Sequence, residues 1–198
     1  MTASRPTTPP GTTRTTLALS AAVGALLALL GAVAVLAVQM HFEARDREHL
    51  HLRLEQARQL LATVDNTAAL AELPARLSSA FRSEDALAVR VQGALDQALF
   101  EQAPHAAMPA ALLARPAQAH PAPLVTWVAD RHHWRGSALV MRMPLDGAAP
   151  LTVAVAVNTE REYSFLFFFR AAVAVYVVLA TLLWAALAHG WLGRAGRR

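Results

Sequence analysis

The sequence predicts a mixed α+β domain with an antiparallel sheet, held between two helices that cross a membrane. Of the 198 residues, 55% are hydrophobic and 16% are charged, which is too apolar for a soluble domain of this length. The excess lies in two long uncharged runs. Between the runs, helical spacing of leucines gives way to several short strand patterns separated by turn residues.

The first predicted membrane helix covers residues 17–40. These 24 positions contain no charged residue and extend about 36 Å as a helix at ~1.5 Å per residue, enough to cross a bilayer. A cleaved signal peptide is the alternative, since Val35-Leu36-Ala37 resembles a cleavage site. Signal peptides carry an apolar part of only ~7 to 15 residues, so we expect an uncleaved anchor. The Thr- and Pro-rich residues 1–16 predict a disordered cytoplasmic tail.

The first span is expected to continue outward as a helix over residues 41–63, which contain no Pro or Gly and place leucines at helical spacing. Asp65 or Asn66 can cap a second helix over residues 67–81, in which Pro74 marks a kink or a boundary.

Strands are predicted after this helix, and the stretch through Phe100 is ambiguous. A Pro- and Ala-rich region at 104–123 precedes a meander of three strands, with turns at Asp130-Arg131 and at residues 145–150. The predicted strands are residues 86–92, 124–129, 133–143 and 151–157. A last helix over residues 159–170 leads into the second apolar run.

The second predicted membrane helix covers residues 171–192, which contain His189 but no Asp, Glu, Lys or Arg. Trp184 and Trp191 lie toward its far end, as expected for an interfacial aromatic belt. All 14 acidic residues lie between residues 41 and 170, whereas both ends carry only Arg. The positive-inside rule therefore places both termini, including the tail 193–198, in the cytoplasm and the domain of residues 41–170 on the other side of the membrane.

Charge and composition exclude several function classes. The net charge of +4 belongs to the two ends, so the central domain lacks the basic face that nucleic-acid binding needs. The chain has no cysteine, which excludes disulfides, thiol nucleophiles and Cys-type zinc sites. No hydrolase motif or phosphate-binding loop is present, and the mixed charges of residues 43–55 predict a solvated, ion-paired helix face.

A soft-metal site is the one chemistry that the residues suggest. Met141 and Met143 share one face of a predicted strand, and thioether sulfur is preferred by Cu(I) and Ag(I). His133 has the same parity, but about 27 Å of strand at ~3.4 Å per residue separates it from Met141. A further ligand must come from elsewhere, and the candidates are His120, His105 and Ser78. The alternative is that the two Met side chains only fill the core.

His41 is a second candidate ligand, because it sits where the first span leaves the membrane. In a parallel homodimer the two His41 side chains would lie near each other and form an interfacial site, with the ring of Phe42 facing the bound cation. The alternative is that His41 is a polar side chain in the lipid headgroup region and binds no metal.

The sequence resembles the sensor region of heavy-metal sensor histidine kinases, the CusS-like group. The resemblance is carried by Met40-His41-Phe42, the segment 70–77, Trp127 followed by residues 130–136, and Gly190-Trp191-Leu192. It implies a PAS-like periplasmic domain that works as a homodimer and controls a cytoplasmic kinase. It also implies that Met and His bind Cu(I) or Ag(I) as the sensed ligand, with no organic cofactor.

The leading hypothesis is therefore the membrane-bound input module of a two-component sensor. The residues contain no phosphoacceptor His box and no ATP-binding region, so kinase activity and a response regulator would require a continuation of the chain or a partner. One alternative is an envelope structural or assembly protein with a protein-binding domain and no metal site. Another is a sensor of the same fold that recognises a different ligand.

Overall fold

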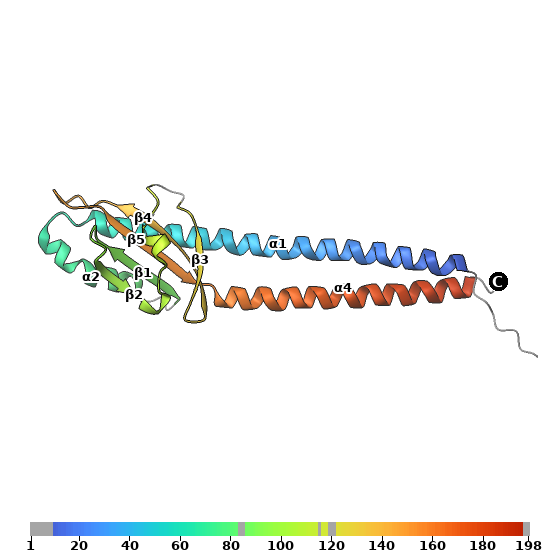
Figure 1. Ribbon diagram of the computed structural model, residues 1–198. Helices are drawn as coiled ribbons and strands as arrows, with labels where there is room; N and C mark the ends of the chain where they lie inside the picture. The colour runs from blue at the N-terminus through green and yellow to red at the C-terminus, as the bar shows by residue number, and fades with distance from the viewer. Residues whose placement is uncertain (1–9, 83–85, 115, 119–121, 196–198) are drawn as a thin grey trace, which may run out of the picture. The chain divides into compact units, whose positions relative to one another are not determined.

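The computed structural model describes residues 10–82, 86–114, 116–118 and 122–195 (Figure 1). The chain divides into two compact units. One is an apolar helix pair, made of residues up to Met40 and from Phe165 onward, and the other is a sheet unit of residues His41–Ser164.

The helix pair is built from the apolar parts of α1 (Pro10–Ala62) and α4 (Glu160–Ala195), both long and apolar enough to cross a membrane. A Cβ atom built on Gly24 lies 3.1 Å from Cγ2 of Thr181, and one built on Gly31 lies 2.6 Å from Cγ1 of Val173. The later residue of α1 contacts the earlier residue of α4, so the two helices pack side by side and antiparallel. Each helix is continuous from this unit into the sheet unit, as the sequence predicts for residues 41–63 and 159–170.

The start of α1 differs from the sequence-based expectation. The helix begins at Pro10, so residues 10–16 of the predicted disordered tail are helical, whereas residues 1–9 lie outside the described residues. Proline suits the first position of a helix, because its missing N–H would have no helical partner and its φ angle is already helical.

The sheet unit contains a five-stranded sheet in the order β2-β1-β5-β4-β3, in which each strand is antiparallel to its neighbours. This arrangement confirms the predicted α+β class and the meander of the last three strands. The strands are β1 (Leu87–Gln92), β2 (Ala98–Gln102), β3 (Val125–Ala129), β4 (His132–Met141) and β5 (Leu151–Asn158).

The main core lies between one face of the sheet and the helices α1 and α2 (Thr67–Phe81). The buried residues of α1 repeat at helical spacing, and the valines of β5 alternate with alanines that face the other side. The α1 residues are Leu50, Leu54, Ala57 and Leu61, and the β5 residues are Val153, Val155 and Val157.

The second face of the sheet is covered by short elements from the Pro- and Ala-rich region, η1 (Pro104–Ala106) and α3 (Ala110–Ala114). Trp134 is 1% exposed there, and the indole N–H of Trp127 donates a hydrogen bond to the carbonyl of Ala106 at 2.8 Å. Because both faces are covered, the central strands β1 and β5 are buried along nearly their whole length.

Two strand predictions need correction. The stretch that the sequence leaves ambiguous up to Phe100 contains the start of β2, which continues to Gln102, and the predicted strand 133–143 ends at Met141. Met141 pairs with Leu151, the first residue of β5, so the ladder has no partner beyond this point. Pro144 also lacks the N–H that a continued ladder would need. Met143 therefore lies after the strand.

Candidate functional site

Met141 and Met143 both contribute to the main hydrophobic core, although Met143 lies after the strand and not on the same strand face as Met141. Met141 is 3% exposed and belongs to the main core, and the partly buried Met143 packs against that core. Two thioether groups in an apolar setting fit a soft monovalent ion better than a hard divalent one. The same packing also serves the core, because Met fills irregular gaps.

His41 lies elsewhere in the sheet unit, exposed on α1. Its ring contacts the ring of Phe42 with the centroids 6.3 Å apart. Leu50 is the first α1 residue in the main core, nine residues or about 13 Å of helix beyond His41. The structure therefore places His41 and the two Met residues in separate regions of the sheet unit.

The other ligand candidates are engaged at different places. His133 is far along β4 from Met141, as predicted, and its ring Nδ1 lies 3.0 Å from a carboxylate oxygen of Glu160. The His105 ring contacts Trp134, on the face of the sheet opposite Met141. The hydroxyl of Ser78 accepts a 3.3 Å hydrogen bond from Arg82. His120 lies outside the described residues.

Among the residues that the structure describes, no three His, Cys, Asp or Glu side chains are grouped closely enough to hold a metal ion. A site for a borderline ion such as Zn(II), built from imidazole and carboxylate within one protomer, is not assembled in this part of the chain.

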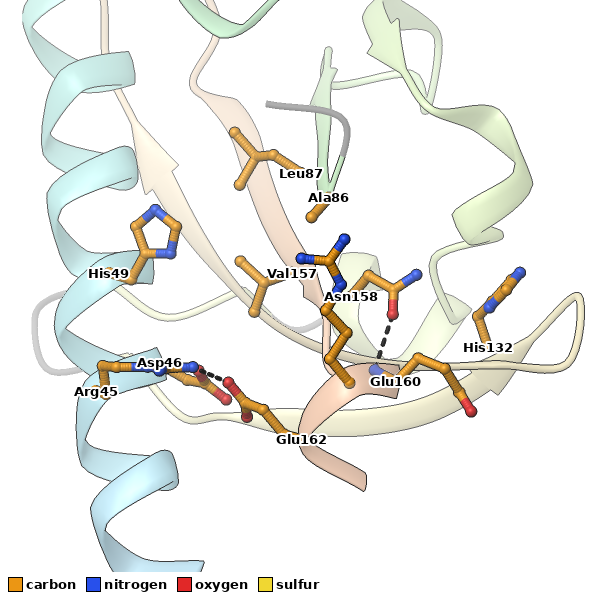
Figure 2. Close-up of a pocket in the computed structure, with 11 residues that line it drawn as sticks. Arg45, Asp46, His49, Ala86, Leu87, His132, Val157, Asn158, Glu160 and Glu162 are labelled. Carbon is orange, nitrogen blue, oxygen red and sulfur yellow. Dashed lines mark hydrogen bonds and ion pairs between the residues drawn. The ribbon is translucent and has the colours of Figure 1, made fainter. Parts of the chain in front are cut away.

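The sheet unit also contains a polar pocket of about 820 Å³ (Figure 2). It lies where α1, the start of β1, the end of β5, the β3–β4 hairpin and the first turn of α4 come together. Its lining residues are Arg45, Asp46, His49, Ala86, Leu87, His132, Val157, Asn158, Glu160, Arg161 and Glu162.

Two ion pairs join three elements on one side of this pocket. Asp46 of α1 is paired with Arg135 of β4, and Arg45 of α1 is paired with Glu162 of α4. In Figure 2 the side chains of Arg45, Asp46 and Glu162 point toward one another. Burial raises the pKa of Glu162, the Asp46 carboxylate raises it further, and Arg45 acts in the opposite direction.

The first turn of α4 is fixed by side chains from neighbouring strands. The Asn158 side chain accepts a 2.9 Å hydrogen bond from the backbone N–H of Glu160. Hydrogen bonds from the ring and the backbone of His133 lower the pKa of Glu160. The His133 ring also stacks on Tyr163 with the centroids 3.8 Å apart. These contacts attach the hairpin to the start of α4.

Asp46 departs from the sequence-based expectation of a solvated helix face over residues 43–55. The residue is 4% exposed, because it continues the buried stripe of α1 one turn before Leu50. An acid at a core position of a helical repeat requires a buried cation, and Arg135 supplies it from 89 residues away. The helical spacing from Asp46 to Leu50 and Leu54 is the signal in the sequence that marks this residue.

Comparison with protein families identifies a sensor domain. A family model described as the CusS sensor domain matches residues 11–166, which include most of α1, the whole sheet unit and the first turns of α4. Neither the curated proteins nor the solved structures gave a match.

Proposed function

The chain belongs to the CusS sensor domain family, the sensor region of heavy-metal sensor histidine kinases, and from this premise we propose that it senses Cu(I) or Ag(I) in the periplasm. The observation that carries the proposal is the extent of the match, since residues 11–166 hold every candidate ligand. As a member of this family the chain is an input module of two-component signalling.

We propose that Met141 and Met143 supply the thioether ligands of one ion. Both pack in the same core, and the remaining coordination would come from a third group in that region. His41 would form a second site with its counterpart in a homodimer, because it is exposed on α1 next to the predicted membrane surface. Soft donors and a dry surrounding favour a monovalent, polarisable ion over Zn(II).

We further propose that both apolar helices span the inner membrane, with the termini cytoplasmic and the sheet unit, of PAS-like fold, in the periplasm. The five-stranded antiparallel sheet with two helices on one face supports the PAS-like assignment. A ligand shifts an equilibrium only when it binds the two arrangements with different affinity. Bridging of His41 between protomers would provide that difference, and the unbroken helices α1 and α4 would transmit it to a cytoplasmic kinase.

The test is calorimetric titration of the full chain in detergent with Ag(I) and with Zn(II), in buffer free of chloride and thiols. We expect Ag(I) binding tighter than about 1 μM, weakened at least about tenfold in the double variant Met141→Leu/Met143→Leu or in His41→Ala. Zn(II) should bind weakly in every case. Leucine conserves the volume of methionine, so the double variant should fold.

Met108→Leu is the matched control, because Met108 packs on the opposite face of the sheet. His51→Ala is the control for His41, since both residues are exposed on α1. Both controls should bind Ag(I) like the wild type. If the wild type binds no Ag(I) more tightly than about 1 μM, the metal proposal fails and an envelope structural role or a different ligand is favoured.

A further inference from the structure

Two carboxyl groups face each other where α1 and α4 meet inside the sheet unit. The Asp46 side chain is 6% exposed and the Glu162 side chain 16% exposed. Figure 2 shows both of them at the floor of the polar pocket, extending from different helices. Carboxylates in such proximity repel each other unless counter-ions or a proton compensate them.

The two counter-ions are unequal. Arg135, which pairs with Asp46, has a side chain only 16% exposed, whereas the side chain of Arg45, the partner of Glu162, is 58% exposed. An exposed guanidinium is screened by water, so it compensates a buried charge less effectively than a buried one does. Glu162 is therefore the less well compensated of the two acids.

One atom of Glu162 also lacks a partner. Its Oε2 is buried and has no hydrogen-bond partner among the residues that the structure describes. A buried, unpaired carboxylate oxygen is costly, because it has lost water and gained no donor. A proton on this oxygen would remove the charge and could be donated to the neighbouring Asp46 carboxylate, which satisfies the atom.

The other ionisable side chains around the pocket are less suited to hold a proton than the Asp46 and Glu162 pair. His49 of α1 has a pKa lowered by burial and by Arg53, which disfavours a proton on its ring. The pKa of Glu160 is lowered by its hydrogen bonds to His133, and it stays ionised. The remaining polar groups that line the pocket are Arg161, His132 and Asn158.

We propose that Asp46 and Glu162 form a proton-binding site that closes the contact between α1 and α4, and so makes the chain responsive to the pH of the compartment that the sheet unit faces. The proton comes from water and binds Glu162, which then donates to Asp46. Loss of this proton leaves two negatively charged carboxylates that face each other, and their repulsion loosens the contact between α1 and α4. The site contains none of the proposed metal ligands, since His41 is five residues from Asp46 and the Met pair lies in the main core, although the Arg45 guanidinium lies 5.4 Å from the ring centroid of Phe42.

The direction of the pH effect follows from linkage. Burial and Asp46 raise the pKa of Glu162 above 4.5, so the folded state holds a proton that the unfolded chain has already released. The stabilisation from this proton is fully present below pH 4.5 and is lost as pH rises through the raised value. Glu162→Gln mimics the protonated acid, because its amide is neutral and can donate to Asp46.

The experiment compares the melting temperature of the full chain in detergent, without metal, between about pH 4.5 and pH 8 for wild type and Glu162→Gln. We expect equal values at the acid end and a higher value for Glu162→Gln at the alkaline end. Infrared difference spectra should also show a titrating protonated carboxyl band in wild type that Glu162→Gln lacks.

Glu72→Gln is the matched control, because it makes the same chemical change in an exposed ion pair with Arg76, 2.8 Å away on α2. It should show no gain in melting temperature at alkaline pH. A difference between Glu162→Gln and wild type that does not change with pH, or a variant that is less stable throughout, would overturn the proposal. Neither result depends on whether the protein binds Ag(I).

Discussion

Gly136 occupies a position in β4 where a side chain has no room. A Cβ atom built there lies 2.8 Å from Cη2 of Trp127 and 2.8 Å from the backbone carbonyl oxygen of Val155. The Trp127 ring could turn away, but its N–H is bound to Ala106, and the Val155 carbonyl belongs to the β5 backbone. The glycine therefore lets β4 approach both its ladder partner and the indole.

We expect Gly136→Ala to lower the free energy of unfolding by about 1–3 kcal/mol, the usual cost of overpacking a filled site. Chemical denaturation of the full chain in detergent measures this change. Gly190→Ala is the control, because a Cβ there has no neighbour within 4 Å. An unchanged midpoint in Gly136→Ala would mean that the sheet adjusts and the close approach is not required.

At the residue scale, the sequence shows which side chains could bind a metal ion more readily than it shows which side chains contact each other. Thioether and imidazole groups are visible in the sequence, so Met141, Met143 and His41 could be selected as ligand candidates. The partner of Asp46 could not be predicted, because Arg135 lies 89 positions away and its pairing follows from the register of β4 against the rest of the sheet. The helical stripe alone could have shown that Asp46 is buried.

The N-terminus of α2 shows how local chemistry defines an element. The side-chain oxygen of Asn66 accepts a 2.8 Å hydrogen bond from the backbone N–H of Ala69, which caps one of the free donors at the helix start. Pro74 in the middle of the helix removes one internal hydrogen bond, so the cap carries more weight here than in an uninterrupted helix.

We expect Asn66→Ala to destabilise the sheet unit by about 0.5–2 kcal/mol, measured as a shift in the unfolding midpoint. Thr67→Ala, one residue later and exposed, should leave the midpoint nearly unchanged. Equal effects of the two substitutions would mean that the interaction with Ala69 contributes nothing to stability.

Elements with strong local signals were predicted to within one or two residues, and elements without them were missed. Helix α2 agrees at both ends, because a cap precedes a periodic apolar pattern. Strand β2 was not recognised, because Ala98–Gln102 is half-exposed and contains helix-favouring residues such as Ala, Leu and Glu. It forms a strand since the tight turn at Gly93 and Asp96 returns it against β1.

At the scale of the whole molecule, composition predicted the two apolar helices and the α+β class. It could not give the strand order, because the pairing of β1 with β5 joins residues 60 to 70 positions apart and depends on tertiary packing. It also could not say whether α1 pairs with α4 of its own chain. In the structure, Gly24 and Gly31 provide the space for α4 to approach.

This intrachain pairing can be tested by cysteine cross-linking, since the protein has no native cysteine. A Cβ atom built on Gly24 lies 3.7 Å from Cβ of Thr181, which is within the range that a disulfide requires. We therefore expect Gly24→Cys/Thr181→Cys to form a disulfide within one chain on mild oxidation in lipid vesicles. The readout is loss of both free thiols on a band that still migrates as a monomer.

The control is Gly24→Cys/Gly190→Cys, because the second position has no neighbour within 4 Å and should keep both thiols free within the monomer. If Gly24→Cys/Thr181→Cys gives only covalent dimers, α1 pairs with α4 of another protomer in the membrane. Signal transmission would then depend on assembly of the dimer. If monomeric disulfide forms, each protomer carries its own antiparallel helix pair, and a ligand bridging two protomers would move two such pairs as units.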